Sequence, residues 1–340
     1  MRKPTSKTVS VVLATHNGAK HIEEQIRSIA AQTLAPSELI ISDDASSDDT
    51  IAIVRNVVSH FGLATRTRIN RNRTPLGFRD NFLRACLLAG GDFIAFCDQD
   101  DVWHPTKLEK CSQFFEDRRV SLIVHAARLI DDDSNHIGLF RQGIRDTTIK
   151  SPLSYDPWNT FWGFSIVFRR ELIGLVDINE RFIDYIVPNE LIAHDRWVTL
   201  LGQLVGATAE IKEPLVSYRQ HPENLFGDGF HKQKIPAVNI RKRSEDYIKA
   251  TSQMVSILSK MPTETNESFP LFDKVRCQQF LNSALLQLRS RHRIYESSTR
   301  SRAFRHVWEC LSDGYYRNVH NGSMRWGSLA RDIKFAALRT

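Results

Sequence analysis

Short apolar runs alternate with segments of helical spacing along the first 125 residues of the chain. The β-branched run 9–14 stops at a polar turn, and Ile22, Ile26 and Ile29 then recur at helical spacing. Repetition of this order predicts strands at 9–14, 38–42, 67–70 and 93–97, with helices from about residues 22, 51, 78 and 105. Such alternation indicates an α/β fold with an open, mainly parallel sheet and helices on both faces.

The alternation becomes less regular in the middle of the chain. Acidic, Pro and Gly residues over 131–160 indicate loops and edge structure. The apolar runs 163–168 and 215–218 predict two further strands, and the spacing over 195–204 predicts a helix between them. We therefore expect the sheet to continue to about residue 225.

The last third of the chain differs from the rest in both pattern and charge. Its apolar residues recur at helical spacing, with breaks near Pro262 and Ser297. Residues 231–340 carry 20 Lys+Arg against 9 Asp+Glu, a balance of +11, whereas residues 1–230 carry 26 against 30, a balance of −4. We expect an α/β domain over 1–230 and a basic, mainly helical region over 231–340, joined through the Gly/His/Lys-rich stretch 227–236.

Composition limits the class of protein. With 340 residues and 41% hydrophobic content, the chain is long enough to fill a globular core. Its five cysteines are odd in number and never form a C-x-x-C pair, so neither a disulfide framework nor a zinc cluster is indicated. No run of 18 uncharged apolar residues and no signal-peptide pattern is present. We therefore expect a protein of a reducing compartment, the cytoplasm, without a spanning helix.

The acidic run 98–101 is the most informative chemical feature. It places Asp98, Asp100 and Asp101 directly after the predicted buried strand 93–97. Three carboxylates so close together repel one another, and a divalent cation relieves that repulsion most directly. The alternative interpretation is a solvated acidic turn.

Three predicted strands end in polar clusters, at 15–18, 43–49 and 98–101. In an open α/β sheet such ends lie side by side along one crevice, which suits a nucleotide. An Asp at a strand end accepts from a base N–H or a ribose hydroxyl, while a metal neutralises a diphosphate. Neither G-x-x-x-x-G-K-[ST] nor G-x-G-x-x-G follows the first strand, which favours phosphates bound through metal over kinases and dehydrogenases.

Several of these segments together resemble a known family. They are Val9-Ser10-Val11-Val12-Leu13-Ala14-Thr15-His16-Asn17-Gly18, Gln32-Thr33, Ile41-Ser42-Asp43-Asp44-Ala45-Ser46-Ser47-Asp48-Asp49-Thr50 and Cys97-Asp98-Gln99-Asp100-Asp101-Val102-Trp103-His104-Pro105-Thr106-Lys107-Leu108. In this order and spacing they are similar to the nucleotide-sugar domain of family-2 inverting glycosyltransferases, which have the Rossmann-like GT-A fold. The resemblance covers about residues 8–225. The Asp-Gln-Asp-Asp-Val-Trp form is similar to the branch rich in bacterial rhamnosyltransferases and other cell-surface polysaccharide transferases.

The resemblance implies roles in donor binding for residues of the first half. Thr15 and Asp44 match positions that contact the nucleotide base, with Asn17 beside them. Asp100 matches the metal ligand of the D-x-D motif, and Asp98 matches a ribose or sugar contact or a second ligand, while Asp101 could replace either. The implied cofactor is Mg²⁺ or Mn²⁺. For Asp43, Asp48 and Asp49 we expect helix capping and loop solvation instead.

The second half supplies the implied base. Asp195 matches the acidic position that deprotonates the acceptor, and one base opposite the leaving diphosphate suffices for inversion. The alternative role for Asp195 is a helix N-cap, and Asp184 and Glu190 are fallback bases.

The segment after the last predicted strand also matches a family motif. It implies that His221 completes the metal site or touches the diphosphate and that Arg219 balances leaving-group charge, although a lone histidine is often structural. Trp162-Gly163-Phe164 resembles the acceptor-side segment, where a glycine lets sugar approach the backbone. Trp103 and Trp162 are equally compatible with a core position.

These features predict a metal-dependent, inverting hexosyltransferase. The resemblance implies a UDP- or dTDP-linked sugar donor and a hydroxyl acceptor on a growing, lipid-linked cell-surface glycan such as O-antigen. A nucleotidyltransferase acting on sugar phosphates is the first alternative, although the loop 15–18 has little of the positive charge that a triphosphate needs. A basic nucleic-acid-binding protein is the second, although no nucleic-acid motif accompanies the charge and we expect no such partner.

The basic tail suggests a membrane partner. Apolar residues at helical spacing lie beside arginines between residues 289 and 305. A basic amphipathic helix lies on an anionic lipid surface, which here predicts peripheral attachment to the inner face of the plasma membrane. The alternative is that these helices pack on the catalytic domain or on a second copy of the chain.

Overall fold

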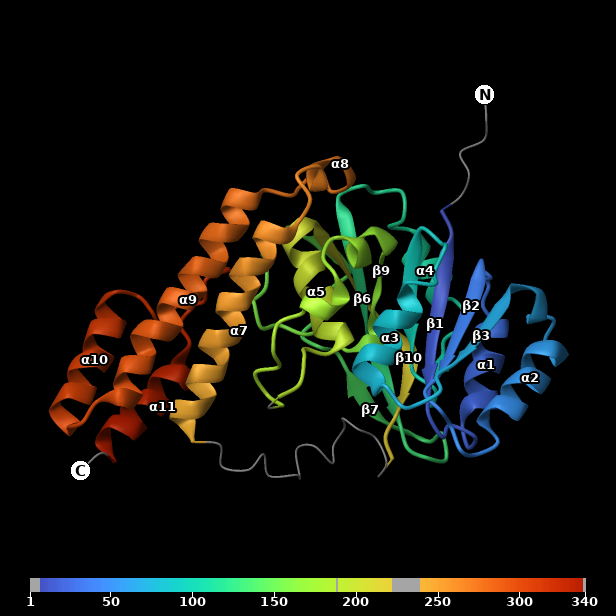
Figure 1. Ribbon diagram of the computed structural model, residues 1–340, viewed down its shortest axis with the longest axis horizontal. Helices are drawn as coiled ribbons and strands as arrows, with labels where there is room; N and C mark the ends of the chain where they lie inside the picture. The colour runs from blue at the N-terminus through green and yellow to red at the C-terminus, as the bar shows by residue number, and fades with distance from the viewer. Residues whose placement is uncertain (1–6, 188, 222–238, 339–340) are drawn as a thin grey trace.

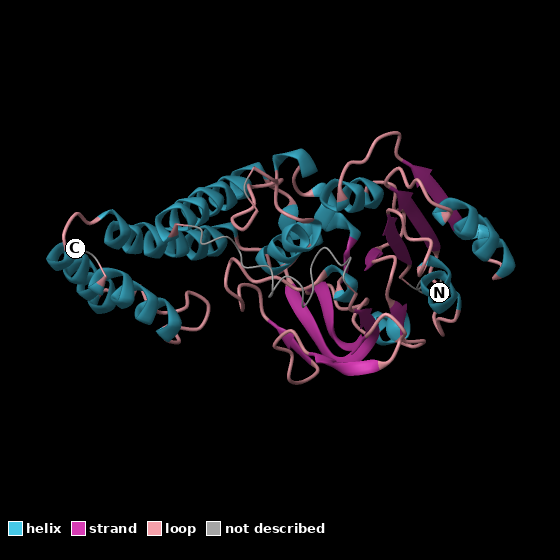
Figure 2. Cartoon of the chain, turned by 90° about the horizontal axis from the view of Figure 1, so that it is seen from below, coloured by secondary structure: helices cyan, strands magenta, loops and turns pink. Residues whose placement is uncertain are grey.

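The computed structural model describes residues 7–187, 189–221 and 239–338. A ten-stranded sheet forms its centre, with helices on both faces, and further helices extend to one side (Figures 1 and 2). The strands are β1 (Val9–Thr15), β2 (Glu38–Asp43), β3 (Thr67–Arg71), β4 (Phe93–Cys97), β5 (Val102–Trp103), β6 (Val120–Ile130), β7 (His136–Phe140), β8 (Thr148–Lys150), β9 (Val167–Arg169) and β10 (Ala207–Arg219). The predicted α/β fold with an open mixed sheet is confirmed.

The sheet has the order β3-β2-β1-β4-β9-β6-β10-β5, with β7 on β6 and β8 on β10. Strands β1 to β4 pair in parallel, whereas β9, β7, β8 and β5 run antiparallel to their neighbours. The helices of this part are α1 (Ile22–Ala30), α2 (Thr50–His60), α3 (Phe78–Cys86), α4 (Lys107–Ser112) and α5 (His194–Val205), with 3-10 turns η1 (Ala64–Arg66), η2 (Gly163–Ser165), η3 (Arg170–Gly174) and η4 (Ile178–Glu180). The parallel half therefore has the alternation that the sequence predicts.

Two segments of the sheet differ from prediction. Residues 163–165 form the 3-10 turn η2, so only the end of the predicted strand 163–168 is extended, as β9. The predicted strand 215–218 is the last part of the much longer β10. Pairing of β10 with β6 shifts register around Pro214, where the proline interrupts the ladder and breaks the apolar pattern of the sequence.

The C-terminal part is helical, as predicted. It contains α7 (Ile240–Lys260), α8 (Thr265–Ser268), α9 (Lys274–Glu296), α10 (Arg300–Ser312) and α11 (Trp326–Ala337). The helix ends at Lys260 and Glu296 agree with the predicted breaks, and the predicted boundary stretch 227–236 lies outside the described residues.

The hydrophobic core extends from the sheet into α7 and α9. Met254 and Leu281 of these helices belong to the same buried cluster as Phe96 of β4 and Trp197 of α5. A second cluster fills the opposite face of the sheet under α1, α2 and α4, and a third joins the end of α9 to α10 and α11. Part of the tail thus packs on the sheet, and its outer part has a small core of its own. None of the described helices is long and apolar enough to cross a membrane.

Candidate active site

The loops that follow β1, β2 and β4 meet at one edge of the sheet. Because β1 pairs in parallel with both β2 and β4, the three carboxyl ends lie side by side. Gln99 joins two of the loops: its side-chain oxygen accepts from Thr15 Oγ1 at 2.8 Å and from the His16 amide at 2.8 Å. Asn17 and Ala45 both have positive φ, 50° and 58°, a strain that is typical of functional loops.

Gly18 gives Gln99 the room for this bridge. A Cβ at position 18 would lie 2.4 Å from the Gln99 side-chain oxygen, well inside contact distance. The Gly18 amide also donates to Thr50 Oγ1 at 2.8 Å, which ties the first loop to the start of α2. A side chain at position 18 would therefore displace the Gln99 amide from its bonds to Thr15 and His16.

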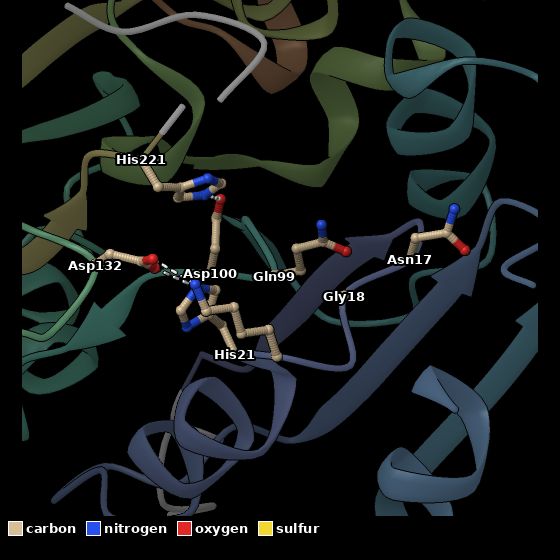
Figure 3. A pocket seen from close by; sticks show the side chains of 8 residues that line it. Asn17, Gly18, His21, Gln99, Asp100, Asp132 and His221 are labelled. Atoms are coloured by element: carbon tan, nitrogen blue, oxygen red, sulfur yellow. Dashed lines mark hydrogen bonds and ion pairs between the residues drawn. The ribbon is translucent and has the colours of Figure 1, made fainter. Parts of the chain in front are cut away.

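A cavity of about 260 Å³ lies beside these loops (Figure 3). Its lining residues are Asn17, Gly18, Lys20, His21, Gln99, Asp100, Asp132 and His221. Asp100 Oδ2 lies 2.9 Å from His221 Nε2, and Asp132 Oδ1 lies 3.0 Å from His21 Nε2. Lys20 also pairs with Asp132. The cavity therefore combines carboxylates with cationic and imidazole groups, a mixture suited to a phosphate with a counter-ion.

Burial and mutual repulsion raise the pKa values of two carboxyl groups at the end of β4. The pKa of Asp98 rises to about 7, because of burial first and then of the charges of Asp100 and Asp195. Burial, followed by Asp100 and Asp98, raises the pKa of Asp101 well above its usual range. Asp101 accepts from the Arg219 amide at 3.0 Å through one oxygen, while its other oxygen is buried without a hydrogen bond. Crowding of the carboxyl groups thus disfavours their charged forms, and a cation bound at the predicted D-x-D motif would favour the charged forms again.

The residues present fit a divalent cation that is held partly by its substrate. Across the described ranges, no three His, Cys, Asp or Glu side chains already form a metal cage. Asp100 and His221 nevertheless supply an oxygen and a nitrogen that lie 2.9 Å apart, and Asp98 precedes Asp100 by two residues in the same loop. Mg²⁺ commonly takes one or two carboxylates and completes its shell with waters and substrate phosphates. Two or three protein ligands are therefore sufficient here.

Arg219 is buried, with 1% of its surface exposed, and its side chain bonds to the acidic loop. Its guanidinium donates to the carbonyl oxygens of Asp100 at 2.8 Å and Asp132 at 2.9 Å, and to Glu24 Oε2 at 2.6 Å. In this geometry Arg219 positions the loops and contributes positive charge, which helps to lower the pKa of His21 after burial. Direct contact of Arg219 with a leaving group, as the resemblance implied, would require these bonds to change.

Asp44 is likewise buried and bonded to protein groups. It accepts from the amides of Leu76 at 2.7 Å and Gly77 at 2.8 Å, and from Asn72 Nδ2 at 2.8 Å. The structure therefore places Asp44 at the base of a loop formed by residues 72–77, beside the β1 end. Asn17 lines the cavity, and its side-chain oxygen accepts from the Ser47 amide at 2.8 Å.

Of the other aspartates of the β2 loop, Asp48 bonds to the first turn of α2 as expected, whereas Asp43 is buried and not solvated, and Asp49 stands at the N-cap position without a side-chain cap bond. Asp43 accepts from the Ser46 amide at 3.1 Å and pairs with Arg71 at 3.3 Å. Asp48 accepts from the amides of Thr50 and Ala19, each at 3.1 Å. These bonds fix the loop in front of α2.

Asp195 lies in the first turn of α5 and close to the acidic loop. Its charge contributes to the raised pKa of Asp98, and burial raises the pKa of Asp195 itself. One oxygen accepts from the Arg196 amide at 2.7 Å. The interpretation of Asp195 as an N-cap is wrong, because Ala193 precedes the helix.

The two fallback bases are placed differently. Asp184 is buried in ion pairs with Arg79 at 2.8 Å and Arg196 at 3.4 Å, and it also accepts from the Ile186 amide. Glu190 is half exposed, 3.9 Å from Arg79. Asp195 is therefore the carboxylate of this group with the fewest bonds to protein cations.

The acceptor-side residues have packing roles. A Cβ at Gly163 would lie 2.9 Å from His194 Nε2, so this glycine makes room for a buried histidine. Trp103 is buried under Lys107, whose ammonium lies 3.7 Å from the ring centroid. Trp162 packs on Phe164 and Tyr218. Trp103 is a core residue, as its alternative interpretation proposed.

Sequence reasoning missed four residues of the cavity: Lys20, His21, Gln99 and Asp132. His21 and Lys20 follow the first polar turn directly, and this proximity was the available signal. Asp132 belongs to an acidic run that the sequence suggested to be a loop only. Asp132 lies beside His21 because of the turn between β6 and β7, and no local sequence pattern predicts that position.

The family model of glycosyl transferase family 2 matches residues 10–175, which include the three loops. The putative glycosyltransferase EpsE of Bacillus subtilis is 33% identical over 125 residues, 37% of this chain and 44% of EpsE. The dTDP-rhamnosyl transferase RfbG of Shigella flexneri is 27% identical over 232 residues, 63% of this chain and 73% of RfbG. The match thus spans less than half the length of EpsE.

The fold is similar to that of S. aureus TarS. The crystal structure of its residues 1–349 aligns over 97% of this chain and 90% of that chain, with a TM-score of 0.55 at 15% identity. Another crystal structure shows residues 1–349 of TarS in complex with UDP-GlcNAc, and it aligns with this chain with a TM-score of 0.50 at 17% identity.

Proposed function

We propose a reaction for this chain on the premise that it belongs to glycosyltransferase family 2. The protein transfers a sugar from a nucleoside-diphosphate sugar to a hydroxyl group, with inversion at the anomeric carbon. The meeting of the β1, β2 and β4 loops at one cavity, with Asp195 near enough to contribute to the raised pKa of Asp98, carries this proposal. A base that faces a diphosphate site is the arrangement that direct displacement needs.

Each residue has one task in the proposed mechanism. Asp195 takes the proton from the acceptor hydroxyl, whose oxygen forms the new bond to the anomeric carbon as the bond to the diphosphate breaks. Asp100, Asp98 and His221 would hold Mg²⁺ or Mn²⁺, which when bound supplies positive charge to the leaving diphosphate. Arg219 keeps the loop of Asp100 in place.

The donor that we propose is a UDP- or dTDP-linked sugar. The name of RfbG gives a dTDP-linked donor and the TarS complex contains a UDP-linked sugar, and both nucleotides carry a pyrimidine base. Thr15, Asn17 and Asp44 lie at the β1 and β2 ends, where the base would bind beside the cavity. The acceptor that we propose is a hydroxyl of a lipid-linked cell-surface glycan such as O-antigen.

Incubation with UDP- and dTDP-sugars and Mn²⁺ tests the reaction class. Slow hydrolysis of one donor to a nucleoside diphosphate, detected by mass spectrometry, supports it. A nucleotidyltransferase would instead release pyrophosphate from a nucleoside triphosphate. If no nucleotide-sugar is hydrolysed or raises the melting temperature, the proposal fails.

We also propose that the outer part of region 231–340 lies on an anionic lipid surface. On α10, Phe304, Trp308 and Leu311 recur at spacings of four and three and are exposed, Trp308 to 70%. Arg300 and Arg305 are exposed on the same helix. Apolar side chains beside arginines fit the boundary between headgroups and acyl chains.

Point variants of the full chain test the membrane proposal better than truncation, because α7 and α9 contribute to the core of the sheet. Trp308→Ser should weaken sedimentation with phosphatidylglycerol vesicles, and salt should weaken it further. Leu87→Ser, which removes an exposed apolar residue outside the tail, is the matched control. Equal sedimentation of the three proteins would refute it.

A further inference from the structure

A second cavity, of about 170 Å³, lies among the C-terminal helices. A liquid water occupies roughly 30 Å³, so the cavity has room for a larger group. It is lined by Trp158, Ile240, Arg243, Ser244, Tyr247, Leu288, Arg291, Tyr295, Arg325, Ser328 and Arg331. These residues come from α7, α9, the start of α11 and the loop before η2, and we call their cavity the arginine pocket.

Three guanidinium groups of the arginine pocket have no carboxylate partner in the part of the chain that the structure describes. Arg291 is neutralised by Asp332, at 2.8 Å, but no ion pair or side-chain hydrogen bond joins Arg243, Arg325 or Arg331 to another described residue. Burial lowers the pKa of Arg325, and the charge of Asp156 partly opposes this shift. Asp156 itself pairs with His320 at 3.4 Å. Arg243 and Arg331 are exposed and Arg325 is half-buried, so three positive charges lie together without a counter-charge among the described residues, which favours an anion.

An aromatic wall completes the arginine pocket. The Arg325 guanidinium lies 5.4 Å from the centre of the Trp158 ring, and the Tyr247 ring meets Trp158 edge-on at 5.7 Å. The Trp158 N–H donates to Thr251 Oγ1 at 3.0 Å, which fixes the ring. Arginine forks held in place by rings are suited to the oxygens of a phosphate or diphosphate.

The same aromatic residues connect the arginine pocket to the proposed base. Tyr247 packs on Tyr185 at 4.5 Å, and the Tyr185 hydroxyl donates to the Trp158 carbonyl at 3.2 Å. The guanidinium of Arg196 lies 5.5 Å from the centre of the Tyr185 ring, and Arg196 is the residue after Asp195. This series of contacts links the arginine pocket to the residue next to the proposed base, and the pocket shares no lining residue with the cavity of His221 and Asp100.

We propose that the arginine pocket binds a phosphate or diphosphate group of the acceptor substrate. The identity of the ligand as an acceptor rests on the proposed transferase function, whereas the anion site is inferred from the pocket residues alone. The group could belong to a lipid-linked diphosphate or to a soluble phosphorylated glycan. Both present the same oxygens to Arg325 and Arg331.

Calorimetry with inorganic pyrophosphate tests the site. EDTA is included because it removes the divalent cation on which pyrophosphate binding in the donor cavity would depend. The wild-type chain should bind, and Arg325→Ala and Arg331→Ala should each weaken binding about 10- to 100-fold, the effect of one charged hydrogen bond. Arg289→Ala, an equal loss of charge on the exposed face of α9, should bind as the wild type does. Unchanged binding in both pocket variants, or none in the wild type, would overturn the proposal.

A second arm separates the two sources and the two proposals. If farnesyl diphosphate binds the arginine pocket more tightly than pyrophosphate does, the group belongs to a lipid-linked diphosphate; if it binds no more tightly, the group is soluble. Melting temperatures of the variants show that they fold, and Arg331 is exposed, so its removal disturbs little packing. Pyrophosphate binding without any sugar transfer would refute the transferase and keep the anion site, whereas transfer without pyrophosphate binding would do the reverse.

Discussion

Replacement of Asp195 by asparagine should stop sugar transfer while leaving the fold and the donor site intact. Asparagine has the shape of aspartate and keeps an oxygen for the Arg196 amide, the 2.7 Å bond that this side chain makes. It cannot take a proton from a hydroxyl. Because burial already disfavours the charged form of Asp195, the neutral side chain should cost little stability.

The expected loss follows from the role of a general base. Such a group contributes about 10²- to 10⁴-fold to rate, which corresponds to roughly 2.7–5.4 kcal/mol of barrier. Donor affinity should be unchanged, since Asp195 does not line the cavity of Asp100 and His221. The loss should therefore appear in kcat and not in the dissociation constant of the nucleotide.

The assay compares transfer rates and donor binding for Asp195→Asn, Asp184→Asn and the wild type. Asp184→Asn serves as the contrast, because Asp184 is tied to Arg79 and Arg196 and its loss should lower stability first. Wild-type turnover by Asp195→Asn would refute the assignment. A folded but inactive Asp184→Asn, or the same result for Glu190→Gln, would move the base to that residue.

Three further results are expected. Transfer should need Mg²⁺ or Mn²⁺, and Asp100→Ala should lose metal-dependent binding of nucleoside diphosphate in calorimetry; full activity in excess chelator would contradict this. The rate should fall on the acid side as pH drops, because burial raises the pKa values of both Asp195 and Asp98, so the acid limb of a pH–rate profile should lie above the usual aspartate range; a limb within that range would contradict this. Asp332→Ala should lower the free energy of unfolding by about 3–5 kcal/mol in urea, since it leaves buried Arg291 unpaired, whereas exposed Asp313→Ala should change it little.

The parallel half of the fold could be predicted because each element carries its own pattern. The runs 9–14, 38–42 and 93–97 became β1, β2 and β4 with ends shifted by one residue at most. Because these three strands are parallel neighbours in the sheet, the polar loops at their carboxyl ends lie together. Elements that depend on distant partners were not predictable: β5 exists only through its pairing with β10.

The site was predictable in its charges but not in its bonds. The sequence located Asp98, Asp100 and His221, and the structure places Asp100 beside His221. It could not reveal that the oxygens of Asp44 accept amides of the 72–77 loop, because spacing does not show which polar group folds over which. The same limit applies to Gly163, whose neighbour His194 lies 31 positions away in the chain.

The core that joins the sheet to α7 and α9 bears on how the protein is made. A ribosome completes α5 at Val205, yet Leu281, which shares the buried cluster of Trp197, is added 76 residues later. At a translation rate of about 5–20 residues per second, apolar surface of the nascent sheet stays exposed for roughly 4–15 s before α9 is synthesised. Folding of the catalytic domain should therefore finish only late in translation, and chaperones that hold nascent chains should increase the yield of active protein.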